Sequence, residues 1–358
     1  MDPPSCDPLA SADVLIRPVD LRSPDDLARY HAGYAQANEH GRRKPTTWSY
    51  PELVESLREP STSERRELFV AEEAGDVVGI AELELPLRDN LHLAFMYVGV
   101  PPEHRRRGIG TALAARLRAG AEGGDRRLAS AWIPGAQLDG DGLPAAFREV
   151  PGEAFARRLG MDLRNTDVHR VLPLPVDGNL LDALAELAAP HHGDYRIAGY
   201  VGPCPDEHVE AYCALKAAMV TEAPLGELEI EPEQWDEQRL REEERELERM
   251  GRTRSSVLAL APDGSVAGFN ELLHAGHDVG NIYNWDTLVL PGHRGHRLGL
   301  ALKVDNLCRL QRAYDDGRWL HTHNAAQNAP MVAVNDQIGF RPVERVGEWQ
   351  GSLAGLPS

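Results

Sequence analysis

Hydrophobic and polar positions alternate in a defined order along the first half of the chain. Alternating or apolar runs predict strands at residues 14–17, 68–73, 77–85, 92–100, 128–133 and 168–172. Apolar residues at helical spacing predict helices at residues 24–37, 49–58, 108–121 and 154–159. Ala74-Gly75-Asp76 separates two of these strands and is typical of a hairpin turn.

The second half repeats this order. Strands are predicted at residues 195–200, 257–261, 266–273, 282–290 and 319–323, and helices at residues 205–218, 231–250, 298–313 and 330–337. Pro173-Leu174-Pro175 forms a stiff break before it, followed by a predicted helix at residues 180–188. A repeat distance of roughly 190 residues is too long for a solenoid, so the pattern indicates two domains of one kind.

The length of 358 residues agrees with two domains, because one core rarely holds so many. We expect a disordered N-terminus over residues 1–10, a first domain over residues 11–173, a linker over residues 174–194 and a second domain over residues 195–350.

The composition excludes several classes of protein. A formal charge of −18 argues against general binding to nucleic acid or anionic membranes. No apolar run reaches the roughly 20 residues of a membrane span, and no signal peptide follows Met1, so we expect a cytoplasmic protein. The four cysteines form no CxxC pair, which argues against a disulfide framework or a metal site.

One basic segment stands out in this acidic chain. Arg105-Arg106-Arg107-Gly108-Ile109-Gly110 follows a predicted strand and begins a predicted helix. A helix N-terminus offers unpaired N–H groups and the positive end of a dipole, where a pyrophosphate meets several donors. The two glycines allow the backbone to approach the phosphates, Thr111 adds a hydroxyl, and the arginines add charge.

The same turn recurs at Arg294, Gly295, Arg297 and Gly299, in the corresponding place of the second half. It differs there, because Arg297 replaces the first glycine. Neither a GxGxxG after the first strand nor a GxxxxGK[ST] occurs, so the pattern does not predict a dinucleotide fold or a P-loop.

With these residues the chain resembles the GNAT N-acyltransferase superfamily over nearly its whole length, and its duplication is similar to that of mycothiol synthase and other actinobacterial double-GNAT proteins. The resemblance implies two α/β (α+β) GNAT folds in tandem. Each has a mixed, mostly antiparallel twisted sheet, flanking helices and a splayed central strand pair, in which the strand before the turn carries a bulge.

The resemblance also implies acetyl-CoA or another acyl-CoA as co-substrate, and no metal. The residues that it assigns to CoA are Val98, Val100, Arg105, Arg106, Arg107, Gly108, Gly110, Thr111, Leu288, Leu290, Arg294, Gly295, Arg297, Gly299 and Asn328.

The catalytic residues are predicted in the second half. The tyrosine that commonly protonates the thiolate in this family is replaced by Ala156 in the first half and by Asn335 in the second. Polar residues gather on two strands of the second half, so the first half is expected to bind acyl-CoA structurally or to be a relic. The candidate acids and bases are Asp286, Glu271, Tyr283, His323 and Asn335, although each could be an ordinary polar strand position.

The acceptor side is predicted from an acidic segment before the helix at residues 231–250. Glu227, Glu229 and Trp285 are expected to contact a small-molecule amine. The implied function is N-acyl transfer from acyl-CoA to that amine by direct attack in a ternary complex, in a monomer or homodimer. Two alternatives remain: a non-catalytic CoA-binding or regulatory protein, and acyl transfer to a hydroxyl or hydrazine in a natural-product pathway.

Overall fold

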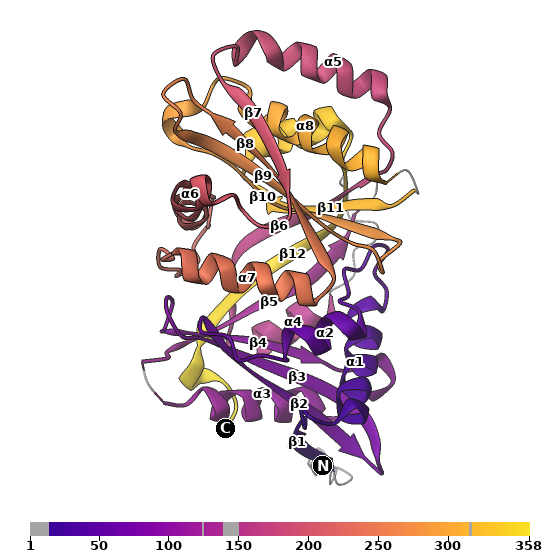
Figure 1. Cartoon of the computed structure of the whole chain (residues 1–358). Helices are drawn as coiled ribbons and strands as arrows, with labels where there is room; N and C mark the ends of the chain where they lie inside the picture. Colours follow the sequence, from indigo (N-terminus) through magenta and orange to yellow (C-terminus); the bar gives the residue numbers. More distant parts are fainter. Residues whose placement is uncertain (1–13, 124, 139–149, 315–316) are drawn as a thin grey trace, which may run out of the picture.

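The computed structural model describes residues 14–123, 125–138, 150–314 and 317–358, and the expected disordered segment 1–10 lies outside them. Two rounds of one element order follow each other, as the sequence predicted (Figure 1). The first round comprises β1 (Leu15–Pro18), α1 (Pro24–Glu39), α2 (Tyr50–Ser56), β2 (Glu64–Glu73), β3 (Asp76–Pro86), β4 (Leu93–Gly99), α3 (Ile109–Ala121), β5 (Leu128–Gln137), α4 (Pro151–Arg158) and β6 (Asp162–Pro173).

The connecting helix α5 (Gly178–Ala188) precedes the second round. That round comprises β7 (Arg196–Val201), α6 (Val209–Glu222), α7 (Glu237–Arg249), β8 (Arg252–Leu260), β9 (Val266–Ala275), β10 (Asn281–Val289), α8 (Leu298–Ala313), β11 (Trp319–Ala325), α9 (Ala329–Ile338) and β12 (Arg341–Ser352). The helix predicted from residue 231 begins later because Asp236 caps α7, its carboxylate accepting from the N–H of Arg239.

All twelve strands join one sheet, in the order β1-β2-β3-β4-β5-β12-β6-β11-β10-β9-β8-β7. The pairs β4/β5 and β10/β11 are parallel, and the other described pairs are antiparallel. This confirms the mixed, mostly antiparallel architecture. The two halves do not form separate sheets, however, because their strands continue one ladder.

The two halves exchange their last strands. β12, at the end of the chain, lies between β5 and β6, and β6 pairs with β11 on its other side (Figure 1). Trp349, Leu353 and Leu356 consequently join the core of the first half under α3, whereas Leu172 and Leu174 join the core of the second. The predicted domain limits follow the chain, but each half of the sheet is completed by a strand from the other.

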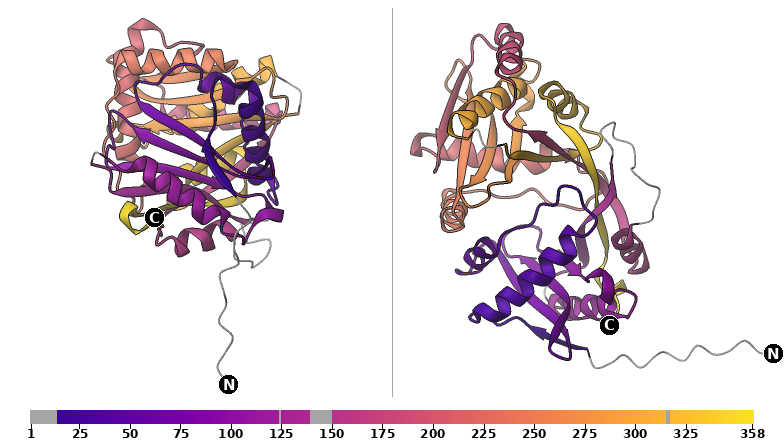
Figure 2. Two further views of the ribbon diagram at one scale, coloured as in Figure 1. Left: turned by 90° about the horizontal axis from the view of Figure 1, so that it is seen from below. Right: turned by 90° about the vertical axis from the view of Figure 1, so that its right-hand side faces the viewer.

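Helices cover both faces of the curved sheet (Figure 2). In the first half, Ile80 packs under α1 and α2, whereas its neighbour Ala81 packs against α3. In the second half, Phe269 packs under α6 and α7, and Ala267 packs against α8. In the part of the chain that the structure describes, no helix has the length and hydropathy needed to cross a membrane.

Candidate active site

The parallel strands β4 and β5 separate after a short paired stretch. They pair from Leu93 and Leu128 to Phe95 and Ser130, and the register ends there. β4 stays paired with β3 without a register shift, so the bulge expected from the resemblance is missing in this half. A gap nevertheless opens between β4 and β5 from Met96 onward, which is the geometry of a splayed central strand pair.

The basic turn lies where β4 ends and α3 begins. Gly108 takes a left-handed φ of 82° and is the N-cap of α3, and no side chain caps the first turn. Gly110 and Thr111 belong to that first turn, so its N–H groups can bind an anion. The Arg105 Nε donates to the Val100 carbonyl at 2.9 Å, which ties the turn to the end of the strand.

The side chains of the other two arginines, Arg106 and Arg107, point away from the turn. Arg107 forms an ion pair with Glu73, and Arg106 has an exposed side chain and a left-handed φ of 64°. Exposed cations beside a helix N-terminus add attraction for a polyanion without desolvation cost.

An apolar cavity lies between the sheet and the helices α3 and α4. Its lining includes Val98 of β4, Ala114 and Leu117 of α3, and Phe155 and Ala156 of α4. The small side chains of Ala114 and Ala156 keep the space open. We call this space the apolar cavity; it can hold a flexible chain that runs from the basic turn toward the gap.

A larger cavity of about 540 Å³ lies on the opposite face, under α1 and α2. Met96, Tyr97, Ala131 and Trp132 line both cavities. The gap between β4 and β5 therefore connects the two faces of the sheet. A group that enters through the apolar cavity can meet a second molecule in the larger one.

Four carboxylates line this larger cavity, which we call the acidic cavity. Glu64, Glu82 and Glu84 lie on β2 and β3, and Glu246 comes from α7 of the second half. The described residues that line the cavity include one basic side chain, that of Arg66. Its Nε donates to Glu82 at 2.7 Å. The carboxylates outnumber the cation, so the cavity attracts positive charge.

Crowding of these carboxylates changes their acidity. Burial, together with Glu64 and Glu82, raises the pKa of Glu84 to about 8, and Glu84 shares a hydrogen bond with Glu64. Burial also raises the pKa of Glu64 and of Glu246. Glu84 therefore titrates near neutral pH, where a proton acceptor is most effective.

The second turn keeps the backbone shape of the first. Arg297 takes a left-handed φ of 51° at the N-cap of α8, in the position of Gly108. The Arg294 Nε donates to the Val289 carbonyl at 3.2 Å, as Arg105 does in the first half. The missing glycine thus adds strain of roughly 1 kcal/mol but preserves the turn.

Side chains pair with this second turn. The Arg294 guanidinium donates to Glu222 at 2.7 Å, and the His296 ring contacts the His191 carbonyl at 3.1 Å. Gly295 has a φ of 88°, and Gly299 lies in the first turn of α8. The predicted CoA residues are therefore assembled here too, but Arg294 already has an anionic partner.

A buried lysine fills the second-half counterpart of the apolar cavity. Lys303 is the sixth residue of α8, the position that Ala114 has in α3. Its ammonium donates to the Asn284 Oδ1 at 2.9 Å, just after Tyr283, where the pairing of β10 with β11 ends. Burial lowers the pKa of Lys303 to about 7.

The strand beside Lys303 also differs from β4. β10 carries a register shift between Asn284 and Thr287, as the resemblance implied. The N–H of Leu290, predicted to bind CoA, donates to the Ala267 carbonyl at 2.9 Å, and Leu288 is buried in the core under α6. The prediction that the Leu290 N–H binds CoA is wrong, because this N–H already donates a hydrogen bond within the sheet.

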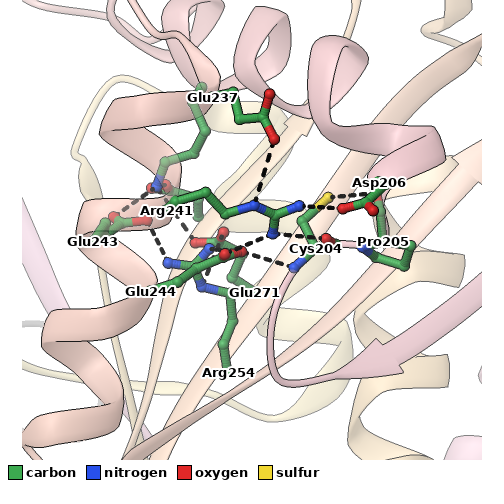
Figure 3. Close-up of polar contacts among 11 residues, drawn as sticks. Cys204, Pro205, Asp206, Glu237, Arg241, Glu243, Glu244, Arg254 and Glu271 are labelled. Atoms are coloured by element: carbon green, nitrogen blue, oxygen red, sulfur yellow. Dashed lines mark hydrogen bonds and ion pairs between the residues drawn. The ribbon is translucent and has the colours of Figure 1, made fainter.

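The acidic cavity also has a counterpart in the second half. The strand registers make Arg254 and Glu271 the counterparts of Arg66 and Glu82. Figure 3 shows the Arg254 guanidinium among carboxylates of α7 and β9, and Arg254 forms its closest ion pair with Glu243.

Lys216 of α6 occupies the second-half counterpart of the acidic cavity. Its Nζ lies 2.8 Å from Asp286 and 3.6 Å from both Glu271 and Glu243, and 4.9 Å from the centre of the Trp235 ring. Burial lowers the pKa of Lys216, but Asp286 and Glu243 raise it overall. Asp286 and Glu271, predicted as bases, thus surround an internal ammonium group, and neither lines the apolar cavity or the acidic cavity.

Replacing Lys216 by methionine should destabilise the fold. Asp286 would lose its cation and Glu243 one of its two, and removal of one partner from a buried ion pair typically costs about 3–5 kcal/mol. Urea unfolding would measure the loss, and adding Asp286→Asn should restore part of it. A loss below roughly 1 kcal/mol, as for an exposed ion pair, would contradict the burial described here.

The remaining candidate acids and bases have structural partners. The Tyr283 ring lies 5.4 Å from the Arg252 guanidinium. Asn335 is buried and donates to the Asn324 Oδ1 at 3.1 Å. The Asn328 side chain caps α9, accepting from the N–H of Met331. These contacts explain why polar residues gather here without requiring a catalytic role.

His323 is enclosed at the junction of the two halves. Its ring stacks on His169 with centroids 4.3 Å apart and meets Trp132 edge-on at 4.9 Å. Burial and the neighbouring rings of His169 and His321 lower the pKa of His323 well below its ordinary value. His323 is half-buried, and its lowered pKa makes it a weak proton acceptor.

The acidic segment before α7 runs over the outside of the first half. Glu229 pairs with Arg127 at 2.8 Å and Glu227 with Arg164 at 3.4 Å, and of these side chains only that of Arg164 is half-buried. The prediction that this segment walls a second-half pocket is wrong, because its backbone bonds tie it to the first half. Trp285 is exposed on the surface of β10.

The acidic cavity was not predicted from the sequence. Glu82 and Glu84 alternate with Leu83 and Leu85 along β3, a pattern that could have placed both carboxylates on one face. No local pattern could have added Glu246, because it reaches the cavity from the other half of the chain.

Comparison with known proteins agrees with this geometry. Residues 35–133 match the acetyltransferase (GNAT) family. A tandem GNAT protein from the clavulanic acid biosynthesis pathway is 26% identical, with a TM-score of 0.75 over 95% of this chain and 99% of that one. No curated protein sequence matches.

Two further solved structures share the fold. A GCN5-related N-acetyltransferase from Sphaerobacter thermophilus is 14% identical, with a TM-score of 0.62 over 95% of this chain and 96% of its own. The Saccharomyces cerevisiae N-myristoyltransferase is 13% identical, with a TM-score of 0.55 over 98% and 82%. The fold is therefore two GNAT folds in tandem, with strands exchanged between them.

Proposed function

We propose that this protein transfers an acyl group from acyl-CoA to a primary amine, and that the reaction takes place in the first half. One observation carries the proposal: the apolar cavity and the acidic cavity share residues at the gap in the sheet, and Phe155 of the apolar cavity lies beside Gly110 of the uncapped basic helix start. The residues along this path have the chemistry of the two substrates, in the order that transfer requires.

The first half fits acyl-CoA. The pyrophosphate would meet the N–H groups of the first turn of α3, with Thr111 and the exposed Arg106 beside it. The pantetheine arm would follow the apolar cavity past Ala114, where unpaired edges of β4 such as Val98 offer backbone partners. The thioester would then lie in the gap beside Tyr97, which faces both cavities.

The acidic cavity fits the amine. Glu84 lies opposite Phe95, the last residue of β4 that pairs with β5, so it flanks the mouth of the gap. With a pKa of about 8, it can take a proton from a bound ammonium and release a neutral amine for attack. Glu82 is less suited because Arg66 already binds it.

The transfer then proceeds by direct attack. The amine nitrogen forms a bond to the thioester carbon while the carbonyl oxygen becomes an oxyanion, for which unpaired N–H groups of β4 are donors. The carbonyl re-forms as the carbon–sulfur bond breaks, the thiolate takes a proton, and the attacking nitrogen loses its second proton. We assign the thiolate's proton to the Tyr97 hydroxyl, because Tyr97 lines both cavities at the gap, and the second proton of the nitrogen restores that hydroxyl.

The second half has a supporting role in this proposal. Lys303 and Lys216 fill its counterparts of the two cavities, and β12 and Glu246 complete the first half. The predicted catalytic role of the second half is therefore replaced. A closer relation to mycothiol synthase stays a prediction of the sequence.

The test is release of free CoA thiol from acetyl-CoA in the presence of a panel of amines, with the products identified by mass. We expect amine-dependent thiol release and an amide product. Binding of acetyl-CoA without release, across amines, alcohols and hydrazines, would overturn the proposal and leave a CoA-binding protein. Release with alcohols alone would move the acceptor to hydroxyl groups.

A further inference from the structure

The charges around the acidic cavity do not balance. Four carboxylates face one arginine among the described lining residues. Arg239 and Arg249 also act on Glu64 and Glu246, but each is paired with a carboxylate outside the cavity, Asp89 and Glu59. Glu64 and Glu84 share a hydrogen bond and one proton, which leaves an excess of two negative charges. Protein interiors rarely keep such an excess without a partner.

The counterpart in the second half shows how this fold balances the same environment. There Asp286 and Glu243 face Lys216 and Arg254, and burial with the charge of Asp286 raises the pKa of Glu271 so that it stays neutral. The balance is even because an ammonium group is built in, with the Trp235 ring beside it. The first half keeps the arginine and the carboxylates but has an open cavity in place of the lysine.

The carboxylates also form a row that leads away from the gap. Glu82 and Glu84 lie on β3, next to β4 and the gap. Glu64 lies on β2, one strand further away, and its charge acts on Glu246 of α7. With strands about 4.8 Å apart, β2 lies roughly 10 Å from β4. One end of the row is at the reaction site, and the other is remote from it.

We infer that the acceptor is a diamine, with one amino group at the gap and a second ammonium held at Glu64 and Glu246. This inference rests on the proposed function and names its substrate class. Trp48, Tyr34 and Trp132 provide aromatic walls for the chain between the two charges. Glu246 is then a specificity residue that the second half contributes to the site of the first.

The experiment compares pairs of acceptors that differ only in the second amino group: butylamine with tetramethylenediamine, and hexylamine with hexamethylenediamine. We expect kcat/KM to be about tenfold or more higher for each diamine, because each contact between charges in such a site is worth that much. Glu246→Gln should lower the diamine-to-monoamine ratio by about tenfold, mainly through KM. Glu248→Gln, an exposed position on the same helix, is the matched control and should leave the ratio unchanged.

The outcomes distinguish a failure of the diamine inference from a failure of the proposed function. Equal turnover of monoamines and diamines, or an equal loss for both with Glu246→Gln, would overturn the inference while leaving amine acylation intact. No thiol release with these four amines or with any other amine of the panel would overturn the proposed function itself. Thermal unfolding of Glu246→Gln checks that the fold is kept, and Glu64→Gln gives a second, independent variant at the remote end.

Discussion

Ala114→Leu should abolish acyl transfer, whereas Lys303→Met, at the same position of the second half, should leave it unchanged. Ala114 lines the apolar cavity, and a larger side chain would fill the path proposed for pantetheine. Displacement of a thioester by about 1 Å can cost a hundredfold in rate, so we expect at least that loss. Lys303 already fills its own site, so its replacement removes no binding space.

Calorimetry with acetyl-CoA and the thiol-release assay would measure both effects. Overpacking at Ala114 could also disturb folding by about 1–3 kcal/mol, so Ala114→Val serves as a graded second variant with a smaller expected loss. Retained CoA binding in Ala114→Leu together with loss of turnover in Lys303→Met would place the reaction in the second half.

Glu84→Gln should lower kcat/KM by about a hundredfold or more and remove an inflection near pH 8. The carboxylate of Glu84 exists above its pKa of about 8, so the rate should rise with pH up to that value. Glutamine keeps the shape but accepts no proton. Because the same amine is used for both proteins, its own titration cancels in the ratio of the two profiles.

The stability of this variant gives an independent check. Folded Glu84 titrates at about 8 and an ordinary glutamate at 4.5, so within this window the folded protein holds a proton that the unfolded chain releases. The contribution of Glu84 therefore falls as pH rises from 4.5 to 8, and Glu84→Gln should flatten that slope. Glu67→Gln, an ion-paired carboxylate of β2, should change neither rate nor slope. A full rate in Glu84→Gln would assign the proton to another group.

The sequence predicted the features that depend on neighbouring residues. The order of elements, the helix start at Gly108 and its repeat at Arg294 follow from local patterns of apolar residues, glycine and charge. Even Arg297 adopts the conformation of a glycine, because the strand end and the helix on either side fix the turn.

The function of the polar strands could not be predicted in the same way. Residues of β10 and β11 were interpreted as a catalytic cluster, but Asn284 binds Lys303 and Asp286 binds Lys216. A pattern along one strand shows that polar groups need partners, and it does not show whether the partner is a substrate or a lysine from a distant helix. For the same reason, the sequence could not show that Glu246 of α7 lines a cavity of the first half.

The exchange of β6 and β12 ties the history of the two halves together. A gene shortened to its first half would encode β5 with an open edge and a core without Trp349, Leu353 and Leu356. Such a product would be prone to associate with other chains through that edge. Because the last strands are exchanged, neither half can be removed without exposing an edge and part of the core of the other, so the second half is needed as a scaffold whether or not it has chemistry of its own.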